Sequence, residues 1–182
     1  MASQNNDIMT TSTPVVFANG TKFYQKLGKK YIRHKKGLFI LAPSGSGKTY
    51  FVNRQKQANW IDGDYLWLAS NADLSSDEWD ADYEEVQEIN IRCDVITHQA
   101  KKLGFWIIGS SNNSLKPDAI VLLPWRKHVA YIKKRQIDNY DGGATVKDLS
   151  GVIKHRRWIR KWKKQGVPCF YSIDEAAEFY AK

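Results

Sequence analysis

Residues 38–51, LFILAPSGSGKTYF, join an apolar run, a loop of small residues and a Gly-Lys-Thr triplet. Four successive apolar residues are typical of a buried strand, and the apolar residues after the triplet favour a helix. Residues 42–49, APSGSGKT, follow the phosphate-loop pattern G-x-x-x-x-G-K-[ST], with alanine at the first position. The segment therefore predicts a strand, a phosphate-binding loop and a helix in succession. The alternative is a Gly/Ser turn that contains Lys-Thr by chance.

Each residue type in this loop has a physical reason to be there. Gly45 and Gly47 permit backbone conformations that point successive N–H groups inward, and the start of a helix adds positive partial charge. Lys48 is expected to reach the β- and γ-phosphates of ATP, and Thr49 to bind Mg²⁺. The predicted nucleotide-binding residues are Ser44, Gly45, Ser46, Gly47, Lys48 and Thr49.

Outward from this loop, apolar runs alternate with segments of helical periodicity. Strands are predicted near residues 37–44, 58–62, 105–111, 118–124 and 166–173. Helices are predicted near residues 21–36, 47–57, 86–103, 125–136, 147–164 and 174–181, with an acidic connection at 74–86 and a flexible turn at 138–144. This alternation predicts a three-layer α/β fold, in which helices cover both faces of a five-stranded parallel sheet.

Composition and charge limit the classes of function. The 182 residues suffice for one domain, and no apolar stretch is long enough to cross a bilayer. Two distant cysteines, Cys93 and Cys169, indicate buried free thiols, a reducing compartment and a cytoplasmic location. The net charge is +9, although residues 62–88 contain ten carboxylates and no Lys or Arg. The basic remainder suits a polyphosphate nucleotide or a nucleic acid, or is simply a solvated surface.

The chain resembles the phosphate-loop (P-loop) kinase superfamily in three places. These are the loop, the segment 60–66 (WIDGDYL) and a strand–loop–helix near the C-terminus. Its members include nucleoside, nucleotide, shikimate, gluconate and adenylylsulfate kinases, and the Asp-Gly-Asp is most similar to that of the last two classes. The resemblance implies an ATP-dependent phosphotransferase that uses Mg²⁺ and a small acceptor, foremost a nucleoside or nucleotide. A polynucleotide 5′-hydroxyl kinase, or another ATP-dependent nucleic-acid-binding protein, is the alternative.

The resemblance also divides the chain. Residues 1–13 are expected to be a disordered tail, and residues 14–36 an N-terminal extension with a basic helix. Residues 37–182 would form the kinase-like domain, with an acceptor segment at about 62–88 and a lid at about 133–160. The oligomeric state is not readable from the sequence.

Asp62 and Asp64 flank a glycine at a predicted strand end, where ligand sites of open parallel sheets lie. A carboxylate there can accept a proton from an attacking hydroxyl or hold Mg²⁺ through water, so both are candidate catalytic residues. The third strand ends in IIGSSN without a carboxylate, which leaves Asp62 or Asp64 as the metal helper. Asp62 is taken as the candidate metal residue together with Thr49. The alternative is an ordinary turn or helix cap.

In the superfamily, arginines of the lid neutralise charge during transfer. Arg135 is therefore a candidate catalytic residue, and Arg156, Arg157 and Arg160 are candidate phosphate-binding residues, because guanidinium groups bind phosphate oxygens in pairs. The alternative is a solvated basic helix face, and Arg157 and Arg160 do lie opposite the apolar stripe on a helical wheel.

Further candidates surround the acceptor. Ser110, Ser111 and Asn112 end the third strand and could hydrogen-bond the acceptor, or form an ordinary polar loop. The acidic acceptor segment disfavours an acceptor with several phosphates, but suits a hydroxyl acceptor or a monophosphate held by Arg92 or Arg126. His128 is expected to be a packed or helix-surface residue rather than a catalytic one. Trp158 and Trp162 are expected to be packing residues, or to stack on bases if exposed. Ser172 and Glu175 predict a capping box.

Overall fold

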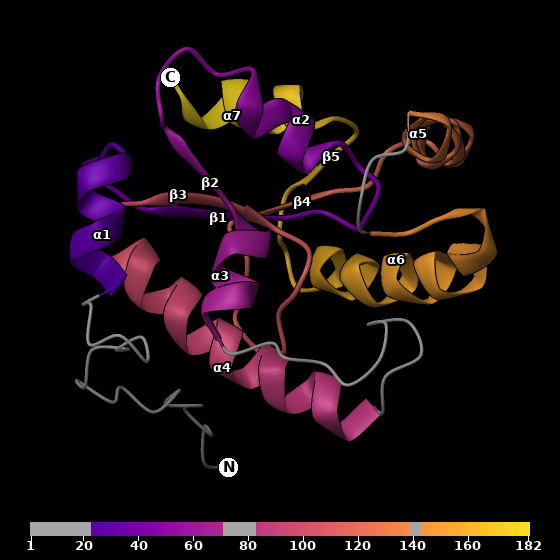
Figure 1. The fold of residues 1–182 in the computed structure, drawn as a ribbon, viewed down its shortest axis with the longest axis horizontal. Helices are drawn as coiled ribbons and strands as arrows, with labels where there is room; N and C mark the ends of the chain where they lie inside the picture. Colours follow the sequence, from indigo (N-terminus) through magenta and orange to yellow (C-terminus); the bar gives the residue numbers. More distant parts are fainter. Residues whose placement is uncertain (1–22, 71–82, 139–142) are drawn as a thin grey trace.

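A five-stranded sheet forms the centre of the structure, a computed structural model that describes residues 23–70, 83–138 and 143–182 (Figure 1). All strand pairs are parallel, and their order is β2-β3-β1-β4-β5. The strands are β1 (Leu38–Leu41), β2 (Trp60–Asp62), β3 (Trp106–Gly109), β4 (Ala119–Val121) and β5 (Cys169–Phe170). The predicted α/β fold with a five-stranded parallel sheet is confirmed.

The chain changes direction across the sheet at β1. From β1 it crosses to β2 beyond β3, whereas after β3 it crosses back to β4 on the other side of β1. Ile40 of β1 pairs with Ile108 of β3 and with Ala119 of β4. Ligands of open parallel sheets bind at such switch points, outside the carboxyl ends of the strands. The loop after β1 lies at this place.

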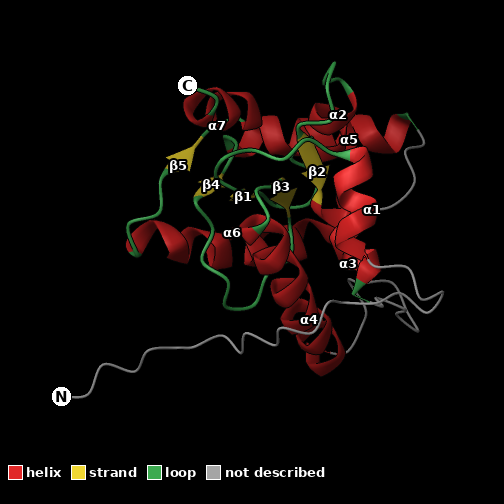
Figure 2. Cartoon of the chain, turned by 90° about the vertical axis from the view of Figure 1, so that its left-hand side faces the viewer, coloured by secondary structure: helices red, strands yellow, loops and turns green. Residues whose placement is uncertain are grey.

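Helices cover both faces of the sheet (Figures 1 and 2). Four of them share one buried cluster with the sheet: α1 (Phe23–Lys30), α3 (Gly63–Ala69), α4 (Tyr83–Lys102) and α6 (Leu149–Lys164). The opposite face packs against α2 (Lys48–Asn53) and α7 (Ile173–Tyr180). A 3₁₀ turn, η1 (Val146–Asp148), precedes α6, and α5 (Trp125–Ile137) contributes Ile132 to a small third cluster with Val152 of α6. None of the described helices has the length and apolarity of a membrane span.

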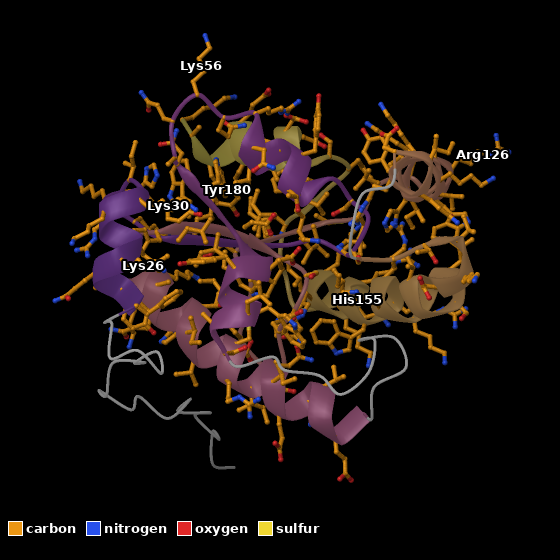
Figure 3. The ribbon with its side chains drawn as sticks, viewed as in Figure 1. Lys26, Lys30, Lys56, Arg126, His155 and Tyr180 are labelled. Atoms are coloured by element: carbon orange, nitrogen blue, oxygen red, sulfur yellow. The ribbon has the colours of Figure 1, made fainter. Side chains whose placement is uncertain are left out.

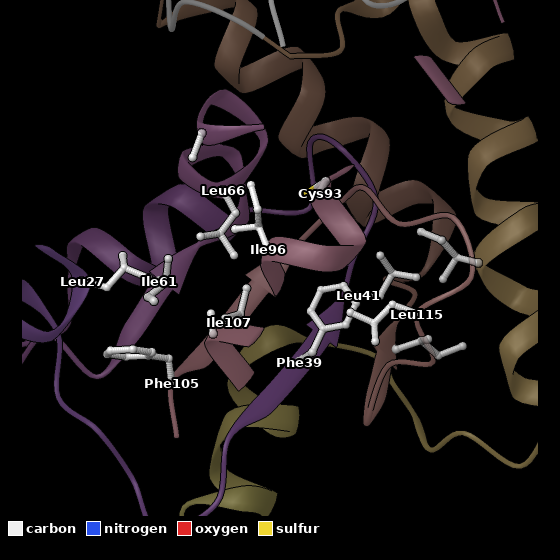
Figure 4. Close-up of a cluster of buried hydrophobic side chains, with 14 of the residues drawn as sticks. Leu27, Phe39, Leu41, Ile61, Leu66, Cys93, Ile96, Phe105, Ile107 and Leu115 are labelled. Carbon is white, nitrogen blue, oxygen red and sulfur yellow. The ribbon is translucent and has the colours of Figure 1, made fainter. Parts of the chain in front are cut away.

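Strand periodicity explains the two large clusters. Phe39 and Leu41 point to the face with α4, whereas Leu38 and Ile40 point to the face with α2 and α7. Figure 4 shows the first cluster, in which Leu27 of α1 joins side chains of the sheet, α3 and α4. The basic N-terminal helix is therefore part of the folded core. Full burial of a side chain of this size stabilises the fold by about 1.5–3 kcal/mol.

The structure differs from the sequence prediction at two helices. No helix was predicted directly after Asp62, but α3 begins there, because the Asp62 carboxylate accepts the Asp64 N–H at 3.1 Å and caps the helix. Helix α2 ends at Asn53, four residues before the predicted end. The predicted tail, most of the acidic connection and the centre of the 138–144 turn lie outside the described residues. Both cysteines are free; Cys93 is buried and Cys169 half-buried.

The predicted cap of α7 is confirmed with one change of partner. The Ser172 hydroxyl accepts the Glu175 N–H at 3.1 Å. The Glu175 carboxylate accepts the N–H of Tyr171 at 3.0 Å, one residue before the expected partner. The helix start is therefore fixed on both sides by side-chain bonds.

Asp118 connects four segments at the amino ends of the strands. Its carboxylate accepts the Phe39 N–H of β1 at 2.8 Å and pairs with Lys101 of α4 at 2.8 Å. Its backbone carbonyl accepts the Tyr180 hydroxyl of α7 at 2.7 Å. One residue therefore joins β1, α4, α7 and the start of β4, at the edge of the sheet opposite the loop after β1.

At the carboxyl ends of β2 and β3 the two backbones nearly touch. A Cβ atom on Gly63 would lie 2.3 Å from the Gly109 Cα and 3.0 Å from the Ile108 carbonyl oxygen. Both neighbours are backbone atoms, which cannot rotate away. The central glycine of Asp-Gly-Asp is thus required by packing between strand ends, and it fixes where Asp62 lies relative to β3.

Replacing Gly63 by alanine is expected to lower the free energy of unfolding by about 1–3 kcal/mol, because the backbones must separate to admit the methyl group. The measurement is urea unfolding followed by far-UV circular dichroism. Gly28→Ala in α1 is the control, because its Cβ would meet only the Arg33 side chain at 3.0 Å, which can move. Equal unfolding midpoints for the two variants would contradict the close backbone contact.

Candidate functional site

The loop between β1 and α2 has the backbone that its glycines predict. Gly45 has φ 77° and Gly47 has φ 90°, both in the left-handed region that favours glycine. The Ser46 N–H donates to the Pro43 carbonyl at 3.3 Å, which closes a turn within the loop. Lys48 begins α2, so the first N–H groups of the helix have no partner within it.

Two polar side chains of this loop are buried in an unusual way. The Lys48 side chain is only 5% exposed, and its Nζ donates to the Pro43 carbonyl at 3.4 Å, so it folds back over the loop. The Ser46 hydroxyl is buried without a hydrogen-bond partner among the described residues. An unsatisfied buried polar group costs about 1–3 kcal/mol, and a missing ligand, water or ion is the usual explanation. Both polar groups therefore lie buried at the loop with few partners among the described residues.

Asp62 lies beside the start of α2, as the sequence predicted. Its carboxylate accepts a hydrogen bond from the Thr49 hydroxyl. Burial raises the pKa of Asp62, and the nearby Asp64 carboxylate raises it further, whereas the Thr49 hydrogen bond and the charge of Lys48 lower it. Asp64 itself is exposed to solvent. The structure thus brings Lys48, Thr49 and Asp62 together, with Asp64 at the edge of the group.

Helix α5 holds the loop from the other side. The His128 imidazole is fully buried, and its Nε2 donates to the Ser44 carbonyl at 2.7 Å. Arg156 of α6 donates to His128 Nδ1 at 2.9 Å, which fixes the tautomer with the proton on Nε2. A Cβ on Gly45 would lie 2.5 Å from the Ile132 Cγ1 atom, so this glycine also makes room for α5. The prediction that His128 is a packing residue is confirmed, and what it packs against is the loop.

Two histidines of this region, the buried His128 and the half-buried His155, are held neutral. Burial is the main cause that lowers the pKa of His128 to about 4, with a smaller contribution from the charges of Arg156 and Lys48. Burial likewise lowers the pKa of His155 to about 4, although a hydrogen bond with the Ser110 backbone opposes this. Neither imidazole adds a positive charge beside the loop at neutral pH.

These two pKa values predict a loss of stability in mild acid. Between about pH 6.5 and pH 4 the unfolded chain binds protons at His128 and His155 while the folded protein does not. As the pH decreases through this range, the free energy of unfolding should therefore fall by roughly 1.4 kcal/mol per pH unit for each histidine. Urea unfolding across this pH range measures the slope. The raised pKa of Asp62 acts in the opposite direction, and comparison with His128→Gln cancels that contribution.

In that comparison the slope should be shallower in His128→Gln than in the wild type by roughly 1.4 kcal/mol per pH unit, because one neutral imidazole is gone. The absolute stability of the variant does not matter for this test. An unchanged slope would show that His128 is not held neutral in the folded protein.

The predicted arginines lie at different places. Arg156 is buried, donates to the Leu123 carbonyl at 2.8 Å and to His128, and so fixes α6 against β4 and α5. Arg157 and Arg160 line a hollow of about 250 Å³ with Trp125 and do not face the loop. Arg135 lies against Gly143, the residue before Ala144. The Ala144 N–H donates to the Ser44 hydroxyl at 3.1 Å, so the segment beside Arg135 contacts the loop. Of the four predicted arginines, Arg135 is thus the one next to this segment, whereas Arg156 supports the loop through His128.

A cavity of about 370 Å³ opens beside the loop, between α3, α4, α6 and the end of β3. Ser44 belongs to its lining, and so do Ser110, Ser111 and Asn112, which the sequence placed near the acceptor. The wall beyond Asn112 is fixed from α4, where the buried Asp94 carboxylate accepts three backbone N–H groups: those of Asn113, Ser114 and Leu115. Neither Arg92 nor Arg126 lines the cavity. Arg92 donates to the Ser70 carbonyl at 2.9 Å, and Figure 3 shows Arg126 on α5, away from His155.

Several residues of this region were not found from the sequence. Trp67 lines the cavity from α3, a short helix that was not predicted. Gln87 and Asn90 line it from the polar side of α4, whereas that helix was predicted from the spacing of its apolar residues. The Ser44–His128 bond joins residues 84 positions apart. Only a three-dimensional arrangement reveals such contacts.

Comparisons of this chain with protein-family models, with curated proteins and with solved structures found no match. The chemistry of the site is therefore the basis on which a function can be inferred.

Proposed function

We propose that the protein is an ATP-dependent phosphotransferase that moves the γ-phosphoryl group to the hydroxyl of a small acceptor, foremost a nucleoside or nucleotide. One observation carries this proposal: a glycine loop with a buried lysine meets a Thr49–Asp62 pair at the switch point of a parallel sheet. The loop would be a phosphate-binding loop of the P-loop kind. Phosphoryl transfer depends on positioning and on neutralising charge, and these residues supply both.

The proposed roles follow from the contacts. The loop N–H groups and the Ser46 hydroxyl would bind phosphate oxygens, and Lys48 would leave the Pro43 carbonyl to neutralise charge on the β- and γ-phosphates. The Thr49 hydroxyl is an oxygen donor of the type Mg²⁺ takes and would hold the ion, with the Asp62 carboxylate as a further partner through water. The ion would supply positive charge that neutralises the phosphates. Among the described residues no cluster of three or more His, Cys, Asp or Glu could hold a metal by itself, which fits an ion that enters with the nucleotide.

In the transfer step, the acceptor hydroxyl gives its proton to the Asp62 carboxylate, and its oxygen forms a bond to the γ-phosphorus. The bond between that phosphorus and the oxygen that bridges it to the β-phosphate breaks, and ADP leaves with the electron pair. Burial beside Asp64 makes Asp62 a better base than an exposed aspartate, because both raise its pKa. Arg135 of α5, which lies against Gly143 beside the segment that contacts Ser44, would reach the leaving phosphates.

An acceptor screen tests the proposal. ADP release would be followed with nucleosides, nucleoside monophosphates, sugars and 5′-hydroxyl oligonucleotides, and products identified by mass spectrometry. The expected result is acceptor-dependent ADP release and a product heavier by one phosphoryl group. ATP turnover with water alone, equal in wild type and Asp62→Ala, would contradict it.

A polynucleotide 5′-hydroxyl kinase, or another ATP-dependent protein that binds nucleic acid, is the second candidate. The observation that favours it is the exposed side of α6, where Lys154, Arg157, Arg160, Lys161, Lys163 and Lys164 occur without an acidic residue in the helix. Oligonucleotide affinity that falls steeply with salt would support this candidate. A small-molecule kinase should bind oligonucleotides weakly at any salt concentration.

A further inference from the structure

Resting on the proposed function, we propose that the acceptor is an uncharged nucleoside whose base lies in the cavity between α3, α4 and α6. The cavity volume of about 370 Å³ lies within the range of about 300–1,000 Å³ that small-molecule sites occupy. Its lining includes Ser44 of the loop, so an acceptor bound there lies next to the phosphate donor.

The lining contains aromatic rings from two elements that are far apart in the sequence. Trp67 comes from α3 and Trp158 from α6, and both are half-buried, with one side packed against the main hydrophobic cluster. The rest of each indole can contact a ligand. A planar heterocycle is the ligand that such rings bind most strongly, since each stacked base gains about 1–3 kcal/mol.

The polar lining suits the edge of a base. Gln87 and Asn90 of α4 and Asn113 after β3 present amide groups, which both donate and accept hydrogen bonds. The Asn112 amide is not open to a ligand. Its Nδ2 donates to the Leu115 carbonyl at 2.7 Å, and its Oδ1 is buried without a partner among the described residues. The amides open to a ligand are therefore those of Gln87, Asn90 and Asn113.

Charge argues against a nucleotide as the acceptor. Lys154 is the one cation in the described lining, its side chain is exposed, and no arginine takes part. His155 also lines the cavity but is neutral, with its pKa lowered to about 4 by burial. The arginines expected to hold a monophosphate, Arg92 and Arg126, lie elsewhere. Acceptor phosphates would also lie near Asp62 and Asp64 at the start of α3, which repel them.

The test separates acceptor binding from catalysis. Steady-state KM values for ATP and for the best nucleoside would be measured in wild type, Trp67→Ala, Trp67→Phe and Gln87→Leu. Trp67→Ala should raise the nucleoside KM about 5- to 150-fold and leave the ATP KM within about twofold, which is the loss expected for one stacking ring. Trp67→Phe should restore most of the affinity. Gln87 is exposed, so Gln87→Leu should fold normally and change the preference among bases.

Phe179→Ala in α7 is the control, because this aromatic residue is 57% exposed and its helix packs on the other face of the sheet. Its nucleoside KM should equal that of the wild type. Nucleoside binding followed by tryptophan fluorescence without ATP keeps the test independent of turnover. If nucleosides bind and Trp67→Ala weakens that binding while no phosphoryl transfer occurs, the nucleoside site stands and the proposed function fails.

Three results would overturn the inference. The first is turnover of a sugar or sugar acid with a KM that is the same in Trp67→Ala. The second is a preference for a nucleoside monophosphate or a 5′-hydroxyl oligonucleotide over the nucleoside. The third is absence of nucleoside binding to the wild type in both assays.

Discussion

Replacement of Lys48 by alanine is expected to lower the rate of phosphoryl transfer by about 10³-fold or more, the loss seen when a cation that neutralises transferring phosphate is removed. The lysine already lies over the loop, buried and bonded to the Pro43 carbonyl at 3.4 Å, so it needs only a small movement to meet a phosphate. The measurement is kcat/KM for ATP with saturating acceptor, together with ATP affinity from equilibrium binding.

Lys56→Ala is the matched control for this variant. Lys56 is exposed on the connection between α2 and β2, where Figure 3 shows it at the outside of the molecule. Its removal should change neither rate nor affinity. Equal kinetics for Lys48→Ala and the wild type would contradict the proposed phosphate site as a whole, whatever the acceptor is.

Replacement of Asp62 by asparagine is expected to lower kcat by about 10²–10⁴-fold, the contribution of a positioned general base. Asparagine can still cap α3 and accept the Thr49 hydrogen bond, so the loss should come from the missing negative charge, which accepts the proton and helps to hold Mg²⁺. The pH dependence isolates the proton-accepting role. In the wild type the rate should fall as pH decreases through the raised pKa of Asp62, because only the carboxylate accepts the proton. This acid limb should be absent in Asp62→Asn.

Asp64→Asn is the comparison for that prediction. Asp64 is exposed, and its charge is the second cause that raises the pKa of Asp62. Its removal should move the acid limb of the pH–rate profile to lower pH, with a smaller loss of kcat than in Asp62→Asn. A larger loss in Asp64→Asn would assign the base to Asp64 instead.

The sequence was sufficient for the fold where one local signal dominated. The continuous apolar run of β1 and the three-and-four spacing of Ile89, Cys93 and Ile96 in α4 correspond to buried positions in the structure. Helix α3 was not predicted because Asp62 is both the last residue of β2 and the cap of α3. Sequence patterns indicate where a strand ends, but they do not show that a helix starts at the same residue. The need for Gly63 depends on Gly109 of another strand, so no local pattern could show it.

The candidate site was predictable only in part, for a similar reason. The rule that carboxyl ends of parallel strands meet at one edge correctly brought Asp62 to Thr49 and Lys48. The same rule says nothing of α5 and α6, so neither the His128–Ser44 bond nor the burial of Arg156 was predicted. Arg156 was predicted to bind phosphate because the sequence shows its charge. The sequence does not show its partners in the fold, which are the Leu123 carbonyl and His128.

The position of Asp118 has a consequence for engineering this protein. It ties β1, α4 and α7 together at the amino ends of the strands, whereas every residue proposed to handle phosphate or acceptor lies at or beyond the carboxyl ends. The contacts of Asp118 thus stabilise the end of the sheet that lies opposite the proposed substrate site. Substitutions near Asp118 that raise thermal stability and substitutions in the cavity that change the substrate are far apart, so their effects should be nearly additive.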